Sequence, residues 1–287
     1  MIVALKKLIK KVPGVIPMIV HTKRVRALKS FERLPLDRSE DSNNRSFRQI
    51  HNLLNYTKTS GSYYSALQFP AGYHSIDIDG HRLQGKRDPA QRLERIPIDF
   101  SGKTLLDIGC NQGGMLFQLD RTIKSGVGID YDPRMINVAN RIKALRGAGN
   151  LQFYVFDLEK EPLALLEDLI PVPKVDVVFL LAVCMWLKNW RSVISCAAKI
   201  SDMMVFESNG TESQQAAQIA YLKELYRDVT LVAEHSDDDP KQKRRKLFWC
   251  REAVAANDAR VRSAVKREQR SPVTESRSTG DIRDVRL

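Results

Sequence analysis

The stretch "LLDIGCNQGG", from Leu105 to Gly114, decides the fold. An apolar run ends in an acidic residue, and glycines with an asparagine among them follow directly. A buried strand, a glycine turn and a helix in this order place backbone N–H groups at one edge of a parallel sheet, where polar or anionic ligand groups bind. The stretch therefore predicts a binding site for a nucleotide-like ligand.

The spacing of the glycines argues against a dinucleotide. The dinucleotide fingerprint is GxGxxG, whereas Gly109, Gly113 and Gly114 stand as GxxxGG. Asn111 takes the middle glycine position, and asparagine tolerates the left-handed backbone that such a turn needs. Asp107 would repel a pyrophosphate but would bind an ammonium group. A nicotinamide dehydrogenase is therefore the least favoured enzyme, and the ligand is expected to carry an amine here.

Alternating strand-like and helix-like patterns surround this stretch. They predict a doubly wound, Rossmann-like α/β fold whose seven-stranded sheet is parallel except for a C-terminal antiparallel hairpin, with a helical N-terminal appendage. Asp132 before Pro133 and Thr211 with Gln214 are helix-start signals. The expected strands are 104–108, 127–129, 151–156, 175–181, 203–206, 229–234 and 246–250, and the expected helices are 42–56, 88–95, 115–123, 133–145, 163–170, 190–200 and 211–226.

The net charge of +12 is concentrated at the two ends of the chain. Residues 1–50 hold 12 Lys and Arg against 4 Asp and Glu, residues 251–287 hold 9 against 6, and the part between is nearly neutral. A protein that binds nucleic acid through its folded domain usually has a basic domain, so this charge distribution disfavours such a protein. Binding of nucleic acid by a basic terminal segment stays an alternative. Peripheral membrane contact of the N-terminal segment is the minority alternative.

Cysteine spacing and hydropathy bear on the compartment. The four cysteines, 110, 184, 196 and 250, form no CxxC pair, which argues against a zinc cluster and a disulfide scaffold. We expect no metal-binding residues. No uninterrupted run reaches the roughly 18 apolar residues of a membrane-spanning helix. We expect a cytoplasmic protein, and the oligomeric state stays open.

Beyond these patterns, the sequence resembles the class I S-adenosyl-L-methionine (SAM) dependent methyltransferases over residues 102–251. The resemblance rests on five stretches in the family's order, "LLDIGCNQGG", "GVGIDYDP", "FYVFDLEK", "DVVFLLAVCMWL" and "VFESNG". It implies SAM as the cofactor, with Asp130 on the ribose hydroxyls, 21 positions after Gly109, and Tyr131 against the adenine. The full set of cofactor-binding residues that we infer is Asp107, Gly109, Asn111, Gly113, Asp130, Tyr131, Asp157, Leu158, Leu181 and Arg87.

Two upstream stretches suggest closer relatives. "GYHSID" and "GKRDPAQRL" are similar to elements of the transfer-RNA wobble-uridine modifying methyltransferases and of the phosphate-capping Bin3-like RNA methyltransferases. This similarity is partial and does not carry an RNA substrate over to the present chain.

With this resemblance, the chain divides into four regions. The order is a basic N-terminal helical segment (1–60), a substrate-side lead-in or cap (61–100), a SAM-binding methyltransferase domain (101–251) and a C-terminal extension or tail (252–287).

Methyl transfer from a sulfonium is an in-line displacement, so the enzyme mainly holds acceptor and methyl group together. Glu207 and His74 are the candidate catalytic bases; a structural ion pair is the alternative for Glu207, and a packing or capping role for His74. Arg87 is expected on the cofactor carboxylate or on an acidic substrate. Tyr73, Trp186 and Asn209 are the expected substrate-binding residues.

The resulting prediction is a SAM-dependent methyltransferase that acts on an oxygen or nitrogen of a small molecule or biosynthetic intermediate. Two alternatives remain at this point. One is an RNA-modifying methyltransferase that holds phosphates with its basic ends, and the other is a catalytically silent SAM-binding scaffold protein.

Overall fold

The computed structural model describes residues 42–57, 69–78, 81–235 and 245–254. The expectations for residues 1–41 and for the tail beyond residue 254 lie outside these ranges. In the described ranges, we find no helix that is long and apolar enough to cross a membrane.

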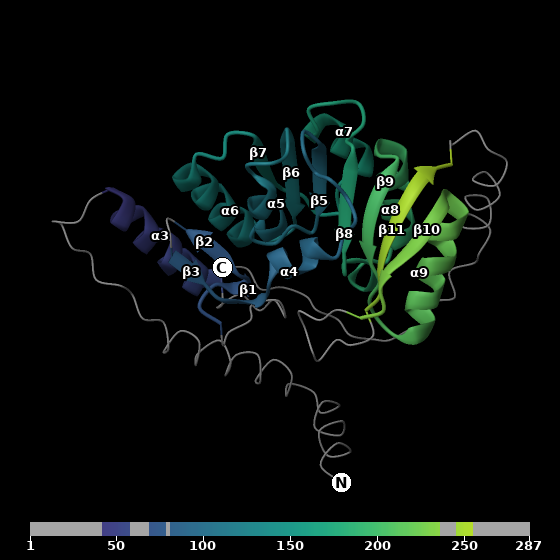
Figure 1. The fold of residues 1–287 in the computed structure, drawn as a ribbon, viewed down its shortest axis with the longest axis horizontal. Helices are drawn as coiled ribbons and strands as arrows, with labels where there is room; N and C mark the ends of the chain where they lie inside the picture. Colours follow the sequence, from purple (N-terminus) through teal and green to yellow (C-terminus); the bar gives the residue numbers. More distant parts are fainter. Residues whose placement is uncertain (1–41, 58–68, 79–80, 236–244, 255–287) are drawn as a thin grey trace, which may run out of the picture.

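A seven-stranded sheet forms the centre of the molecule, in the order β10-β11-β9-β8-β5-β6-β7 (Figure 1). In this sheet, strands β5 to β9 run parallel to one another, and β11 lies antiparallel to both β9 and β10. The predicted doubly wound sheet with its closing antiparallel hairpin is confirmed. The strand bounds are β5 Thr104–Ile108, β6 Ser125–Asp130, β7 Leu151–Val155, β8 Val177–Leu181, β9 Met203–Glu207, β10 Tyr226–Ala233 and β11 Leu247–Ala253.

Strand β5 is the point where the winding of the sheet reverses. It pairs with β6 on one side and with β8 on the other, although β8 is the third strand after β5 in the chain. In open α/β sheets the crevice outside the carboxyl ends of such strands is where ligands bind. The stretch Leu105–Gly114 spans this end of β5 and the turn that follows it.

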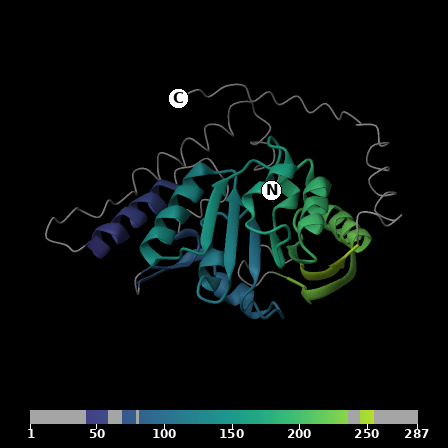
Figure 2. The same ribbon diagram turned by 90° about the horizontal axis from the view of Figure 1, so that it is seen from above.

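Helices cover both faces of the sheet, and each face has its own apolar core. On one face Leu105 packs in a cluster with residues of α3 (Ser42–Thr57), α5 (Gly114–Leu119) and α6 (Pro133–Arg146). On the other face Leu106 and Ile108 pack with residues of α7 (Leu166–Leu169), α8 (Trp190–Ile200) and α9 (Glu212–Leu225). The alternation follows from the period of two along a strand. Seen from above, α3 lies at one end of the molecule, and α9 with the β10–β11 hairpin lies at the other (Figure 2).

The helix-start signals read from the sequence are present. The Asp132 carboxylate accepts a hydrogen bond from the Arg134 N–H at 2.9 Å, with Pro133 at the first helical position of α6. Thr211 and Gln214 form a reciprocal capping box at the start of α9. Both devices satisfy N–H groups that the first helical turn leaves without partners.

The segment before the sheet forms a cap, which we define as residues 71–94. It contains four short strands that the sequence did not indicate, β1 (Gly72–His74), β2 (Ile76–Ile78), β3 (His81–Leu83) and β4 (Gly85–Arg87), and the expected helix α4 (Pro89–Glu94). β1 pairs in parallel with β4, and β2 pairs antiparallel with β3. Three-residue strands separated by turns are too short for a recognisable alternation.

Candidate active site

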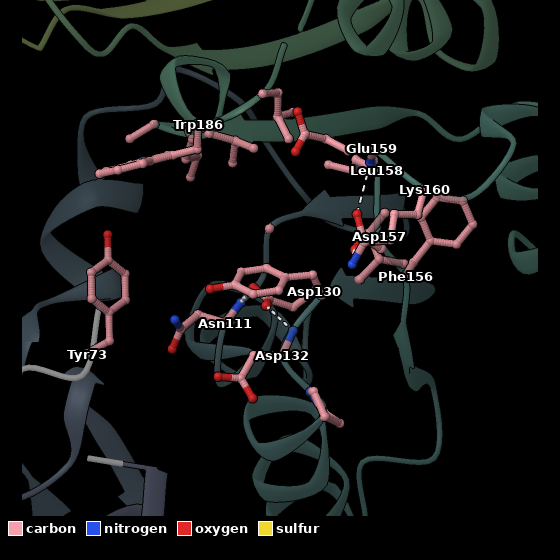
Figure 3. A pocket seen from close by; sticks show the side chains of 18 of the residues that line it. Tyr73, Asn111, Asp130, Asp132, Phe156, Asp157, Leu158, Glu159, Lys160 and Trp186 are labelled. Carbon is pink, nitrogen blue, oxygen red and sulfur yellow. Dashed lines mark hydrogen bonds and ion pairs between the residues drawn. The ribbon is translucent and has the colours of Figure 1, made fainter. Parts of the chain in front are cut away.

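A cavity of about 890 Å³ lies at the carboxyl ends of the parallel strands (Figure 3). Tyr73 and Trp186 stand on one side of it, Phe156 and Asp157 stand on the opposite side, and Asp130 lies between them. The cavity brings together nine of the residues chosen from the sequence, Tyr73, Gly109, Asn111, Asp130, Tyr131, Asp157, Leu158, Leu181 and Trp186.

The glycine turn is held open toward this cavity by its backbone conformation. Gly109 has φ +79°, and a Cβ at this position would stand 2.6 Å from Cγ2 of Val183. The N–H groups of Gly109 and Cys110 donate to the Ile129 carbonyl at 2.8 and 2.9 Å, which fixes the turn against β6. Asn111 adopts φ 53°, the left-handed conformation expected from the sequence. Gly113, also left-handed at φ 77°, precedes α5 and does not line the cavity.

Asp130 at the end of β6 is held by the turns on both sides of it. Its Oδ2 accepts from the Asn111 N–H at 3.0 Å, and its Oδ1 accepts from the Asp132 N–H at 2.9 Å. Burial raises the pKa of Asp130 to about 6 in spite of these backbone hydrogen bonds. The carboxylate also lines the cavity, so its remaining acceptor capacity is available to hydroxyl groups of a ligand.

Asp107 near the end of β5 lies deeper. Its side chain is 2% exposed, does not line the cavity, and its Oδ2 has no hydrogen-bond partner within the described part of the chain. Burial raises the pKa of Asp107 to about 7; Arg92 lowers it and Asp130 raises it further. A buried carboxylate oxygen without a donor is costly. An ammonium group on a bound ligand would supply that donor.

The wall opposite Tyr73 is formed after β7. Asp157 is bound by Lys160 at 2.8 Å, and this hydrogen bond lowers the pKa of Asp157. The Leu158 carbonyl accepts from the Asn189 side chain at 2.7 Å. Tyr131 is 53% exposed, an unusual exposure for an aromatic ring that lines a cavity, and it offers a flat apolar face to a ligand ring.

The loop after β8 forms the remaining wall, and Asn209 holds it in shape. The Asn209 side chain donates to the Ala182 carbonyl and accepts from the Met185 N–H at 2.9 Å. Ala182 has φ 58°, so this clamp holds a backbone conformation that alanine rarely adopts. Asn209 is fully buried behind the wall and does not line the cavity, whereas Trp186, carried by this loop, is 45% exposed. Substrate contact by Asn209 stays a prediction.

The two candidate bases, Glu207 and His74, lie beside the cavity and not on its lining. The buried Glu207 carboxylate forms an ion pair with Arg92, and guanidinium nitrogens of Arg87 and Arg245 stand 4.0 and 3.5 Å from it. Arg87 also lies 5.9 Å from the ring centre of Tyr73, which lines the cavity. We call Arg87, Arg92 and Arg245 with Glu207 the arginine cluster. Arg245 was missed by the sequence reading, because nothing local links it to the strand ends.

His74 is buried against the glycine turn. A Cβ on Gly114 would stand 2.6 Å from Cβ and Cγ of His74, so the imidazole lies on the backbone at the start of α5. This contact corresponds to the packing alternative for His74. A catalytic role for this residue stays untested.

Comparison with known proteins agrees with this geometry. A family profile described as "Methyltransferase domain" matches residues 99–252. The U6 snRNA methylphosphate capping enzyme Amus of Drosophila melanogaster is 38% identical over 121 residues, 38% of the present chain and 40% of that protein. The chain therefore spans about two fifths of the length of this curated relative.

Among solved structures, the N-terminal domain of EvdMO1 with SAH bound has a TM-score of 0.54 at 15% identity, covering 74% of this chain and 100% of that one. The same domain in the presence of SAH and D-fucose has a TM-score of 0.53 at 14% identity, covering 76% and 100%. These identities show a shared fold alone. Because the family profile matches more than half of the chain, the protein belongs to the methyltransferase-domain family, and the resemblance to the class I SAM-dependent methyltransferases is confirmed.

Proposed function

We propose that this enzyme methylates an oxygen of a phosphate group carried by a small molecule or biosynthetic intermediate. The observation that carries the proposal is the arginine cluster, in which three guanidinium groups from separate segments converge beside the cavity. Guanidinium groups match phosphate oxygens with parallel, charge-assisted hydrogen bonds. The cytoplasmic location stays a prediction from the sequence.

The cavity itself suits the cofactor. In this proposal Asp130 accepts the ribose hydroxyls, Tyr131 lies against the adenine, and Asp107 receives the ammonium group. The buried Oδ2 of Asp107, which has no hydrogen-bond partner among the described residues, supports the fit. When bound, SAM supplies an electrophilic methyl group attached to a positively charged sulfur.

The arginine cluster stands on the acceptor side of this arrangement. Glu207 ends β9 and is in register with Leu181, the end of β8, which lines the cavity. Arg87 approaches the cavity through Tyr73. None of the three arginines lines the cavity, so in this proposal an acceptor that enters between Tyr73 and Trp186 reaches Arg87 behind Tyr73.

A phosphate acceptor also explains the position of the candidate bases. A phosphate monoester carries about −1.5 to −2 charges at pH 7, so its oxygen can attack without first losing a proton to the enzyme. Glu207 then serves to hold the arginines in place, and His74 serves to seat the cap on the turn. Both roles follow from the contacts that these side chains make.

An RNA acceptor is the second candidate. It is supported by the relative whose name describes a methylphosphate capping enzyme of U6 snRNA, and by the excess of Lys and Arg in residues 1–50 and 251–287. Such basic arms would bind the phosphate backbone with an affinity that falls steeply with salt.

The test is to incubate the protein with SAM labelled on its methyl group and with cell extract. Before the reaction, portions of the extract are treated with alkaline phosphatase, with ribonuclease or with neither, and the added enzyme is removed. We expect incorporation to disappear after phosphatase and to persist after ribonuclease.

Other outcomes discriminate among the alternatives. If label is lost after phosphatase and also after ribonuclease, the RNA acceptor is favoured. Phosphatase removes the terminal phosphate of an RNA, and ribonuclease degrades its chain. Undiminished labelling after phosphatase overturns the phosphate proposal. The control is Asp130→Ala protein, which should incorporate nothing in any portion.

A further inference from the structure

Gln112 joins the glycine turn to the cap. Its side chain is fully buried, and Nε2 donates to the Ala71 carbonyl at 3.0 Å while Oε1 accepts from the His74 N–H at 3.2 Å. A single side-chain amide therefore binds the chain on both sides of Tyr73, which lines the cavity. Because neither bond is local in sequence, Gln112 ties together two segments that could otherwise separate.

Close packing reinforces these two hydrogen bonds. A Cβ on Gly72, which has φ +80°, would stand 3.2 Å from Nε2 of Gln112. Gly114 lies against the His74 ring with no room for a side chain between them. Turn and cap are thus in direct contact, and a shift of one must displace the other.

A continuous series of hydrogen bonds leads from Gln112 to the cofactor side of the cavity. The Gln112 N–H donates to Oδ1 of Asn111 at 2.9 Å, and the Asn111 N–H donates to Oδ2 of Asp130 at 3.0 Å. On the other side, His74 pairs in β-sheet register with Arg87. The series therefore connects Asp130 with the cap residue Arg87 of the arginine cluster.

We propose that Gln112 is a positioning residue that couples occupancy of the cofactor side to the position of the cap. The inference rests on the proposed function, in which Asp130 binds SAM while Tyr73 and Arg87 bind the acceptor. A ligand that hydrogen-bonds to Asp130 orders the turn, and Gln112 transmits this order to β1. Coupling of this kind is reciprocal and is commonly worth a factor of about 5 to 150 in affinity.

The test measures amide hydrogen exchange of residues 69–78 in the full chain, with and without SAH. Gln112→Met keeps the side-chain volume and removes both hydrogen bonds. Gln218→Met is the matched control, because Gln218 on α9 is equally buried and binds both the N–H and the carbonyl of Asn209, at 3.1 and 2.9 Å. A general loss of stability would affect both variants.

In the wild type and in Gln218→Met, we expect SAH to slow exchange of this segment at least about fivefold, the lower end of typical coupling. In Gln112→Met, SAH should still bind by calorimetry but should leave the exchange rates unchanged. Gln112→Glu keeps the acceptor for the His74 N–H and loses the donor to Ala71, so we expect an intermediate response. It also supplies a second variant if Gln112→Met does not fold by circular dichroism.

Two results overturn the coupling. One is a wild-type segment whose exchange does not respond to bound SAH, and the other is a response that persists at full size in Gln112→Met or, if that variant does not fold, in Gln112→Glu. Neither result involves the acceptor. The phosphatase experiment tests the phosphate proposal independently of hydrogen exchange. A failure of the coupling and a failure of the phosphate proposal are therefore distinguishable.

Discussion

The Asp130 carboxylate and the Asn111 N–H form a hydrogen bond of 3.0 Å that joins the end of β6 to the turn after β5. One carboxylate therefore both stabilises the glycine turn and faces the cavity. Removing it affects the local structure and the proposed cofactor contact together, so a neighbouring acidic residue is needed as a control.

Asp130→Ala should weaken SAH binding at least about 100-fold while the protein stays folded, because charge-assisted hydrogen bonds to the ribose are lost. Isothermal titration calorimetry and circular dichroism check the two parts. Asp132→Ala is the control, since Asp132 also lines the cavity but caps α6. It should lower the free energy of unfolding by about 1 kcal/mol and change SAH affinity far less. Equal losses of affinity in the two variants would contradict the ribose contact.

Asp107 predicts a pH dependence of stability. Burial raises its pKa from 3.8 to about 7, so the folded chain holds the proton more tightly than the unfolded chain. The free energy of unfolding contributed by this group therefore falls as the pH rises from about 4 to about 7, by up to about 4 kcal/mol. Asp107→Asn should remove this part of the slope. Asp130, with a pKa of about 6, contributes a slope of the same sign that remains in the variant.

The same residue predicts a pH dependence of cofactor binding with the opposite sign. An ammonium group binds the ionised carboxylate, so SAH affinity should rise with pH, by up to about tenfold per unit below pH 7. Calorimetric titrations between pH 5 and pH 7.5 measure this slope for the wild type and for Asp107→Asn. Ionisation of Asp130, with a pKa of about 6, adds to the slope at the lower end of this range. A wild-type slope between pH 6.5 and pH 7.5 that is retained at full size in the variant would exclude Asp107 as the ammonium partner.

Gly109→Ala should destabilise the turn for two reasons. The residue has φ +79°, and its new Cβ would approach Cγ2 of Val183 to 2.6 Å. We expect the free energy of unfolding, measured by urea denaturation, to fall by about 2 to 4 kcal/mol. Adding Val183→Ala to this variant should restore the part of that free energy that the close contact removes. Gly147→Ala is the control, because Gly147 has φ +64° but open space around it. This variant should lower the free energy of unfolding by only about 1 kcal/mol. Similar losses at both glycines would show that the contact with Val183 contributes nothing.

The arginine cluster gives a test that separates acceptor from cofactor. Arg87→Met should reduce labelling of the phosphatase-sensitive fraction by raising its apparent KM about tenfold or more, with SAH affinity within a factor of about three. Arg82→Met is the control in the same cap, because Arg82 forms exposed ion pairs with Asp77 and Asp88. If Arg87→Met instead weakens SAH binding, Arg87 contacts the cofactor carboxylate, as the sequence first suggested.

The central part of the sheet was predictable because β5, β8 and β9 are buried on both faces and read as apolar runs. β5 and α8 have the bounds expected from the sequence, whereas β6 extends beyond the expected 127–129 on both sides. Gly126 and Gly128 weaken the strand pattern there. They are glycines because a Cβ at either position would stand within 3 Å of neighbouring side chains.

The cavity residues were predictable from their place at strand ends, but the contacts between the cap and the turn were not. Gln112 contacts residues about 40 positions earlier in the chain, and Arg245 contacts Glu207 from the segment just before β11. Such contacts depend on the tertiary arrangement and leave no periodic trace. One local signal existed for Gln112, since a long amide side chain is unusual between Asn111 and two glycines in a tight turn.

Strand β11 lies between β9 and β10, although it follows both in the chain. During synthesis, one edge of β9 therefore stays unpaired until residues 247–253 have been made. An open parallel sheet with an unsatisfied edge recruits strands from other molecules. A premature stop codon shortly before Leu247 should thus yield an aggregating product instead of a smaller, weakly active enzyme.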